Sequence, residues 1–209
     1  MPKVSREHQE SRRNQIIDAA VKCFAQKGFH QTSMQDIVAE SGLSPGAIYL
    51  YFKSKEEIIK TIADLRHASE NEIIAGAFGS DDPNIALNQL IETFFNSLAD
   101  PEVRLQRSIG VQLWGEALSN PLVHEIVRQG FTESKNALTE VLTVYQKQGK
   151  LSSDLSPEVI ACVMQAQFQG FVLQVALGEP LDIQEYIKVI KHWIAGSSFK
   201  TKSIGEGSR

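Results

Sequence analysis

The chain of 209 residues is long enough for one large domain or for a small domain joined to a medium one. Hydrophobic residues make up 42% of it and charged residues 22%, a balance that argues against a disordered, collagen-like or disulfide-stapled protein. The net charge of −4 hides an asymmetry, because residues 1–60 carry nine Lys or Arg and seven Asp or Glu, whereas residues 61–209 carry twelve and eighteen. A cationic first third on an acidic body is typical of a small nucleic-acid-binding module attached to a second domain.

Neither an export signal nor a membrane span is expected. The first fifteen residues have no apolar centre, and four glutamines between residues 165 and 174 interrupt the strongest apolar stretch. The two cysteines, Cys23 and Cys162, lie far apart inside apolar helical patterns, which predicts two buried thiols in a reducing compartment. We therefore expect a soluble, cytoplasmic protein without a membrane partner.

Apolar residues recur at three- and four-residue spacing along the chain, which predicts an all-α fold. A first helix is expected to end at Gly28. A second begins after Ser33, which forms a capping box with Asp36, and it ends at Gly42. A third helix of about two turns begins directly after Ser44.

The rest of the chain is predicted to be helical as well. A second capping box, formed by Ser54 and Glu57, opens a fourth helix that continues to about Phe78. Five further helical segments follow, separated by turn residues. The segment 158–177 is apolar nearly all round, which indicates a helix buried on more than one side, and the segment 183–194 has one apolar face.

Two short helices joined by Gly42-Leu43-Ser44 match the helix-turn-helix, whose turn needs a glycine with a left-handed backbone. The residues expected to fill the angle between them are Ile37, Leu43, Ile48 and Phe52. The second helix then presents small and aromatic residues to solvent, namely Pro45, Gly46, Ala47, Tyr49 and Tyr51. Such a face fits closely into a major groove, where Ala47 and Met34 can touch thymine methyl groups. Lys53 and Lys55 flank this face with positive charge.

The run from Ser33 to Lys55 resembles the DNA-binding domain of TetR-family transcriptional regulators, and the resemblance covers about residues 10–70. The spacing that carries it is that of Gly42, Gly46, Tyr49, Tyr51-Phe52 and Lys55. Val38 and Ser41 depart from the pattern, because the family usually has alanine at both positions. The resemblance implies that the following residues face DNA: Ser33, Ser44, Pro45, Gly46, Ala47, Tyr49, Tyr51 and Lys55.

These residues are expected to take different shares in DNA binding. Those expected to hold phosphates are Thr32, Ser33, Tyr51, Lys53 and Lys55, and those nearest the bases are Met34, Pro45, Ala47 and Tyr49. The third helix projects no Arg, Asn or Gln, so specificity is expected to rest on methyl contacts, Gln35 and DNA shape. Arg12 and Arg13 are either further phosphate contacts or solvated residues.

By the same resemblance, residues 10–70 form the DNA-binding domain with its motif at about 33–52, and residues 71–197 form a ligand-binding and dimerisation domain. From Ser197 onward Ser, Lys, Gly and Glu replace the apolar pattern, so residues 198–209 are expected to be a mobile tail. The candidates for ligand contacts are Phe94, Phe95, Leu98, Ile109, Leu113, Trp114, Phe131, Gln165 and Gln169. Aromatic residues on helix stripes are also ordinary core residues, and the glutamines of the apolar helix need partners that either a ligand or a dimer interface supplies.

Two protomers are expected to pair their last two helices into a four-helix bundle, since these helices carry more apolar surface than one small domain covers. The interface candidates are Phe168, Phe171, Val175, Ile187, Ile190 and Ile194.

The sequence therefore predicts a homodimeric DNA-binding repressor, released from a palindromic operator by a small, largely apolar effector. An activator or a regulator answering to a partner protein would have the same DNA-binding fold. From a different class, a helical small-molecule-binding protein or an enzyme has less support, because the five histidines are scattered and no cofactor or metal motif is present. We expect no enzyme activity, no cofactor and no metal.

Overall fold

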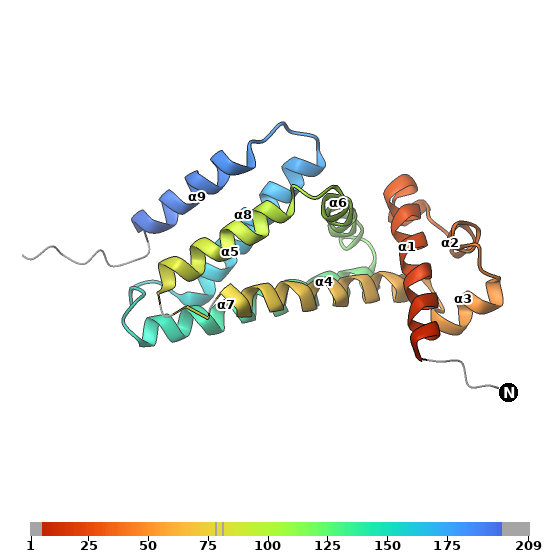
Figure 1. Cartoon of the computed structure of the whole chain (residues 1–209), viewed down its shortest axis with the longest axis horizontal. Coiled ribbons are helices and arrows are strands. Elements are labelled where there is room, and N and C mark those ends of the chain that lie inside the picture. The colour runs from red at the N-terminus through yellow and green to blue at the C-terminus, as the bar shows by residue number, and fades with distance from the viewer. Residues whose placement is uncertain (1–5, 78, 81, 198–209) are drawn as a thin grey trace, which may run out of the picture. The chain divides into compact units, whose positions relative to one another are not determined.

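The computed structural model describes residues 6–77, 79–80 and 82–197, without the side chains of residues 77 and 194–197. Every regular element in these residues is an α-helix (Figure 1), so the predicted all-α class is confirmed. The helices found there are α1 (Arg6–Gln31), α2 (Met34–Ser41), α3 (Pro45–Tyr51), α4 (Lys55–Ala77), α5 (Pro83–Ser97), α6 (Pro101–Glu116), α7 (Pro121–Lys147), α8 (Pro157–Ala176) and α9 (Ile183–Ser197). The expected mobile tail and the expected helix end at Phe78 lie outside the described residues.

The chain forms two compact units, which are described separately. Unit 1 comprises Met1–Arg66 and Arg104–Gly130, and unit 2 comprises His67–Val103 and Phe131–Arg209. This division differs from the expected split at residue 70, because most of α6 and the first part of α7 group with the N-terminal helices. The sequence pattern does not reveal that grouping, because an apolar stripe on a helix does not tell which other helix packs against it.

The ends of α2 and α3 follow the local signals in the sequence. The hydroxyl of Ser33 accepts from the backbone N–H of Asp36, and the Asp36 carboxylate accepts from the backbone N–H of Ser33, which confirms the capping box. Gly42 ends α2 in the left-handed region with φ 68°. The Ser44 hydroxyl then accepts from Ala47 N–H and caps α3.

The core of unit 1 lies between α1, α2 and α3 and is extended by α6 and α7. Ile37, Ile48 and Phe52 are at most 1% exposed and Leu43 packs against them, so the predicted filling of the helix-turn-helix angle is confirmed. Ile109 and Leu113 of α6 belong to the same cluster.

The placement of α6 corrects one expectation. Ile109 and Leu113 are 2% and 6% exposed and support the helix-turn-helix as core residues, whereas the sequence analysis places them in a ligand cavity. Their helical spacing marks both as apolar but does not tell which distant helices cover them.

The core of unit 2 contains a cluster of aromatic rings from α5, α8 and α9. Phe95 lies 5.1 Å from Phe171 and 5.3 Å from Tyr186 between ring centroids, and Phe171 lies 4.2 Å from Tyr186. Burial raises the pKa of the Tyr186 phenol. An ion pair between Lys191 and Glu92 adds a polar tie between α9 and α5. The three helices therefore form one packed layer inside unit 2.

α8 is apolar nearly all round, as expected, but its faces differ in what covers them. Phe171 is fully buried, and Phe168 packs its ring against Phe94 and Phe95 with centroids 5.2 and 5.5 Å apart. On α9, Ile187 and Ile190 are 5% and 6% exposed. Most of the predicted dimer interface thus packs inside the protomer.

The expected interface role of Phe171, Ile187 and Ile190 is corrected, because these side chains are buried within the protomer. Because α8 carries apolar residues on every side, the sequence does not distinguish the face that meets its own protomer from a face left bare. Val175 is half-buried, and the side chain of Ile194 lies outside the described residues. Cys162 is exposed on α8 rather than buried, whereas Cys23 is buried as predicted.

α8 is also, among the described helices, the one that is long and apolar enough to cross a membrane, with a mean hydropathy of 1.5 over its best 18 residues. The interrupting glutamines lower its hydropathy less than expected. Length and composition alone are weak evidence of a span, because a helix packed on two sides in a soluble protein has the same composition.

Candidate nucleic-acid interface

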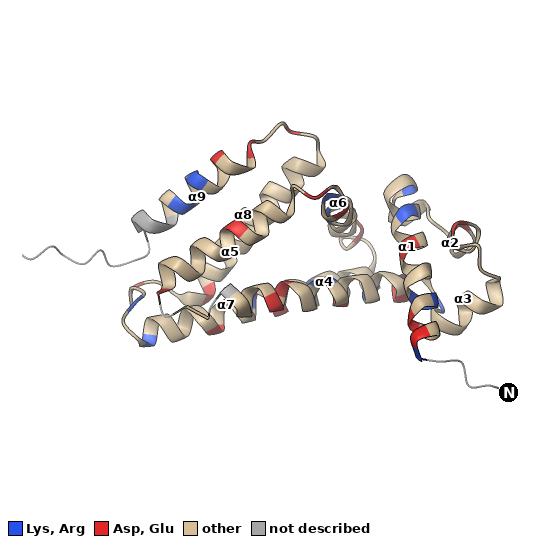
Figure 2. Cartoon of the chain, viewed as in Figure 1, with Lys and Arg blue, Asp and Glu red and all other residues tan. Residues whose placement is uncertain are grey.

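The outward face of α3 is small, uncharged and exposed. Pro45, Gly46 and Tyr49 lie on it, and Tyr49 is 48% exposed. Ala47 and Tyr51 are half-buried at its margin. Figure 2 shows α3 without a single Lys, Arg, Asp or Glu. This surface offers shape and apolar contact rather than charge to a partner.

One prominent member of this face is not among the residues expected to face DNA. Leu50 is 85% exposed, more than any other large hydrophobic residue of α3. It lies four residues after Gly46, and residues at that spacing share a helix face. The spacing alone therefore contains the signal that places Leu50 beside Tyr49 and Gly46.

The residues expected to hold phosphates are placed in different ways. Ser33 and Ser44 are exposed at the starts of α2 and α3. Thr32 is 1% exposed, and its hydroxyl lies 2.8 Å from the carbonyl oxygen of Gly28 and 3.2 Å from that of Cys23. The structure corrects the expectation for Thr32, because a buried hydroxyl already bonded to carbonyls is not presented to a phosphate.

Met34 is half-buried and packs against the core of unit 1, as does Tyr51. Gln35 is exposed on α2. Gln35 is therefore more accessible than Met34 and Tyr51, which present only part of their side chains.

The two lysines after α3 have unlike surroundings. The Lys55 ammonium donates to the carbonyl oxygens of Phe29 at 2.9 Å, His30 at 3.2 Å and Thr32 at 3.2 Å, and it lies 4.6 Å from the centre of the Phe29 ring. Lys55 therefore fixes the connection between α1 and α2, which corrects its expected role as a phosphate contact. The Lys53 side chain is exposed and remains a candidate for that role.

The two arginines of α1 also differ. The Arg13 guanidinium donates to the Thr61 hydroxyl at 3.1 Å and lies 5.4 Å from the centre of the Phe52 ring, so it packs within unit 1. Arg12 donates to Gln15 on the same helix at 2.8 Å and is half-buried. Arg13 therefore fits neither expected alternative, phosphate contact or solvated residue, because its guanidinium packs against Thr61 and Phe52 within unit 1.

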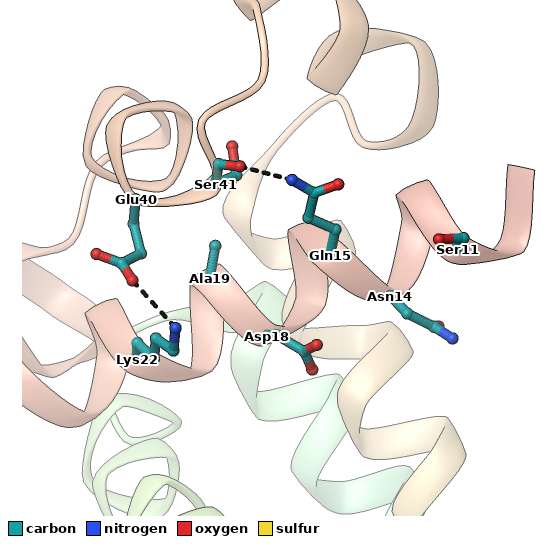
Figure 3. Close-up of a pocket in the computed structure, with 8 residues that line it drawn as sticks. All are labelled: Ser11, Asn14, Gln15, Asp18, Ala19, Lys22, Glu40 and Ser41. Atoms are coloured by element: carbon teal, nitrogen blue, oxygen red, sulfur yellow. Dashed lines mark hydrogen bonds and ion pairs between the residues drawn. The ribbon is translucent and has the colours of Figure 1, made fainter. Parts of the chain in front are cut away.

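Polar contacts fix α2 against α1. The Gln15 amide donates to the carbonyl oxygen of Ser41 at 2.8 Å, and Lys22 pairs with Glu40 at 3.3 Å. Figure 3 shows both contacts among the residues that line a polar groove between the two helices. The volume of this groove is about 670 Å³. Because Gln15, Lys22 and Glu40 already have partners, we interpret the groove as part of the α1–α2 contact and not as a ligand site.

A third contact of this kind lies at the start of α2. The Lys27 ammonium is 2.5 Å from the Asp36 carboxylate. This bond, together with the hydrogen bonds from Ser33, holds the pKa of Asp36 well below its usual range. The same bond raises the pKa of Lys27. The first turn of α2, beside the expected phosphate contact Ser33, is thereby held in place by α1.

The end of α6 contacts the break in α1 at Gly28, whose φ of 79° is left-handed. The backbone N–H of Phe29 donates to the Gln112 side chain at 3.3 Å, and His30 Nδ1 lies 3.5 Å from a carboxylate oxygen of Glu116. α6 therefore contacts Phe29 and His30, the same residues whose carbonyl oxygens accept from Lys55.

The remaining ligand candidates are divided between the units. Trp114 belongs to unit 1, whereas Phe94, Phe95, Leu98, Phe131, Gln165 and Gln169 belong to unit 2. Phe95 and Leu98 are 4% and 0% exposed. Phe94, Gln165 and Gln169 are half-buried, and the Gln165 amide donates to the carbonyl oxygen of Phe131 at 3.2 Å. In the part of the chain that is described, no group of three or more His, Cys, Asp or Glu is placed to hold a metal ion.

The capped pair α2 and α3, with the outer face of α3 exposed, has the arrangement of the helix-turn-helix. Proteins of this class place the second helix of the motif in the major groove of DNA. Two family models match the chain. Residues 16–62 match the model of bacterial regulatory proteins of the tetR family, and residues 83–197 match the model of the C-terminal part of BetI-type transcriptional repressors. The chain therefore belongs to the TetR family and is a DNA-binding transcriptional regulator.

Individual relatives agree with this membership. Over 63 residues the chain is 48% identical to the uncharacterized HTH-type transcriptional regulator YfiR of Bacillus subtilis, a match spanning 30% of this chain and 31% of YfiR. It is 24% identical over 179 residues to the HTH-type transcriptional repressor Rv1474c of Mycobacterium tuberculosis, spanning 86% and 90% of the two chains. The structure of a complex of SmeT with triclosan is similar in fold, with a TM-score of 0.76 and 21% identity over 95% of this chain and 96% of that one. SmeT is the repressor of the Stenotrophomonas maltophilia efflux pump SmeDEF.

Proposed function

We propose that the protein is a repressor that binds a near-palindromic operator as a homodimer and leaves it when a small, largely apolar molecule binds unit 2. The observation that carries the DNA-binding part is the exposed, uncharged face of α3 on the core of unit 1. A two-fold dimer would place two such helices in successive major grooves, roughly 34 Å apart along the duplex. Its place of action is the cytoplasm, where a soluble regulator meets DNA.

The dimer is supported by an apolar seam along α8 and its C-cap residue Leu177, most of which is exposed on the protomer. Its members follow one another at alternating four- and three-residue steps, namely Val159, Val163, Ala166, Gly170, Leu173 and Leu177. Val159, Val163 and Leu177 are 59%, 54% and 73% exposed. This heptad-like spacing suits knobs-into-holes packing against a second helix, and the small Ala166 and Gly170 permit close approach. On α9, Val189 and Trp193, one turn apart, are 42% and 62% exposed and extend the apolar surface.

The effector is proposed to contact the half-buried surface that α5 and α8 share in unit 2. Phe94 and Phe168 supply aromatic contact there, while Gln165 and Gln169, one turn apart on α8, supply amides that orient a ligand. SmeT, whose structure is similar, binds the apolar compound triclosan, which supports an apolar effector here. An uncharged or cationic molecule fits the acidic character of residues 61–209.

Release of DNA is proposed to act through α4, which starts at Lys55 in unit 1 and ends in unit 2. An effector changes operator affinity only if it binds the DNA-free arrangement more tightly. A coupling free energy of about 1–3 kcal/mol would lower operator affinity roughly 5- to 150-fold.

The test is a gel-shift titration with the duplex upstream of the protein's own gene, followed by a panel of hydrophobic compounds added to the preformed complex. We expect one dimer to shift the duplex, binding to weaken steeply with salt, and at least one compound to release the DNA. The Gln169→Ala variant should require a higher concentration of that compound for release of the DNA, while its affinity for DNA stays that of the wild type. A duplex that no concentration of dimer shifts contradicts the operator, and a compound that binds equally with and without DNA contradicts the coupling.

In vitro transcription distinguishes the alternatives that share this fold. A repressor lowers transcription from the bound promoter and the compound restores it, whereas an activator raises transcription. Release that requires a protein fraction, and no small molecule, would favour a partner-regulated protein.

A further inference from the structure

Leu50 adds a large exposed apolar side chain to the face of α3. Single exposed leucines are common on protein surfaces and need no explanation. Leu50, however, is 85% exposed and directly follows Tyr49, which is 48% exposed, on a helix without a charged residue. Two large exposed side chains with apolar surface are therefore consecutive on the element that the helix-turn-helix presents to DNA.

The backbone beside Leu50 is bare. Gly46 precedes Leu50 by four residues and Tyr49 by three, so both side chains share its helix face. A Cβ atom added at Gly46 would meet nothing within 4 Å. Leucine side chains in helices lean toward the preceding turn, which places the Leu50 side chain next to the open surface of Gly46. A partner can therefore approach the α3 backbone at Gly46 while touching Leu50.

We propose that Leu50 reads a thymine methyl group in each half of the operator. The inference rests on the proposed DNA-binding function and adds a specificity residue to it. The leucine side chain has neither donor nor acceptor, so it gains nothing from the hydrogen-bonding edges of the bases. The thymine C5-methyl is the apolar group that a base pair presents in the major groove. Contact with Leu50 removes both from water and so favours T·A over the other base pairs at that position.

The experiment measures the methyl contact directly. A duplex is selected from a random-sequence pool with the full-length protein, and each thymine of the selected site is then replaced by deoxyuridine, which lacks only the methyl group. Kd values are measured for the wild-type protein, for Leu50→Ala, and for Leu118→Ala as a matched control. Leu118 lies in the turn between α6 and α7 of the same unit and is 90% exposed.

For the wild-type protein we expect the deoxyuridine replacement to weaken binding roughly three- to fivefold at one thymine position per half-site, as the loss of about one buried methyl group implies. Leu50→Ala should bind the unmodified site more weakly by a similar factor and be insensitive to deoxyuridine at that position alone. Leu118→Ala should behave like the wild type. Thermal unfolding should be the same for all three proteins, because both leucines are exposed.

Three results would overturn the proposal. The first is that Leu50→Ala binds the selected site as tightly as the wild type. The second is that the deoxyuridine penalty persists unchanged in Leu50→Ala, and the third is that no thymine responds to the loss of its methyl group. In each of these cases the selected duplex still binds, so the DNA-binding function stands and only the role of Leu50 fails. Failure to enrich any duplex would instead contradict the DNA-binding function itself, and the role of Leu50 with it.

Discussion

At Gly46 the requirements of folding and of DNA binding differ. Helix propensity favours alanine over glycine, and an added Cβ meets open space at this position. The fold alone therefore gives no reason for glycine there, whereas close approach of the α3 backbone to base edges does.

We therefore expect Gly46→Ala to leave the free energy of unfolding unchanged or to raise it by up to about 1 kcal/mol. The same substitution should weaken operator binding at least tenfold, because the methyl group stands between the backbone and the bases. Urea unfolding and gel-shift titration measure the two effects. A variant that binds DNA as tightly as the wild type would contradict the close approach.

Lys53 and Lys55 should give opposite results although they are two residues apart. Lys53→Ala should leave stability intact, weaken DNA binding evenly across sequences and reduce the slope of log affinity against log salt by about one. Lys55→Met removes a charged donor from three carbonyl oxygens and should lower the free energy of unfolding by about 1.5–3 kcal/mol. Equal stability of the two variants would contradict the assignment of Lys55.

Asp36 makes a part of the stability depend on pH. Its pKa is lowered by Lys27 and Ser33 in the folded protein, so its contribution is complete above the unfolded pKa of about 4 and is lost as the pH falls below that value. The difference in free energy of unfolding between the wild type and Asp36→Asn should therefore shrink from pH 7 to pH 3. Glu40→Gln, at the neighbouring ion pair with Lys22, is the matched control. A difference that stays constant over this range would exclude Asp36 as the source.

The residues that the sequence predicts well are those whose partners are close in the chain. Ser33 and Asp36 cap one helix, and Gly42 turns the chain within the next few residues, so local chemistry determines them. Thr32 and Lys55 are misassigned because their partners are carbonyl groups fixed by the tertiary fold. Polar side chains of the same type serve phosphates and carbonyls equally well, and only the structure distinguishes the two.

At the scale of elements, α8 is the helix whose existence was predictable and whose orientation was not. Its apolar residues form one stripe that packs on α5 and α9, as Phe171 does, and another that is left exposed, as Val163 is. Hydrophobic periodicity distinguishes an apolar face from a polar one. It does not distinguish two apolar faces from each other, so the predicted interface includes residues that are buried within the protomer.

The two faces should respond differently to a charge. Leu173→Glu, on the exposed seam, should leave a folded protomer but break the dimer, because a buried unpaired charge costs about 3–5 kcal/mol. Ile187→Glu, at a position 5% exposed within the protomer, should unfold unit 2 instead. Analytical ultracentrifugation and far-UV circular dichroism separate the two outcomes. A stable dimer of Leu173→Glu would rule out the seam as the interface.

At the scale of the whole molecule, unit 1 is not a continuous piece of chain. Its core takes Ile109, Leu113, Ala117 and Val123 from the segment 104–130. The resemblance of residues 10–70 to a DNA-binding domain identifies the motif but not the full set of residues that support it.

A fragment of residues 1–66 should therefore be far less stable than unit 1 within the full chain, since it leaves Ile37 and Ile48 without part of their core. We expect a broad, weakly cooperative urea transition by far-UV circular dichroism, against a steep one for the full-length protein. A fragment with a steep transition and full helicity would show that the first three helices are self-sufficient.

The chain passes between the two units three times, inside α4, α6 and α7. This interleaving limits how the family can recombine. A hybrid protein that takes residues 1–70 from one relative and the rest from another combines two parts of the unit 1 core that come from different proteins. Phe29 and His30 then contact the other relative's residues at positions 112 and 116. Hybrids that exchange operator specificity should fold and bind DNA when residues 104–130 are taken from the same relative as the first segment. The DNA-binding unit is therefore encoded by two separate stretches of the gene.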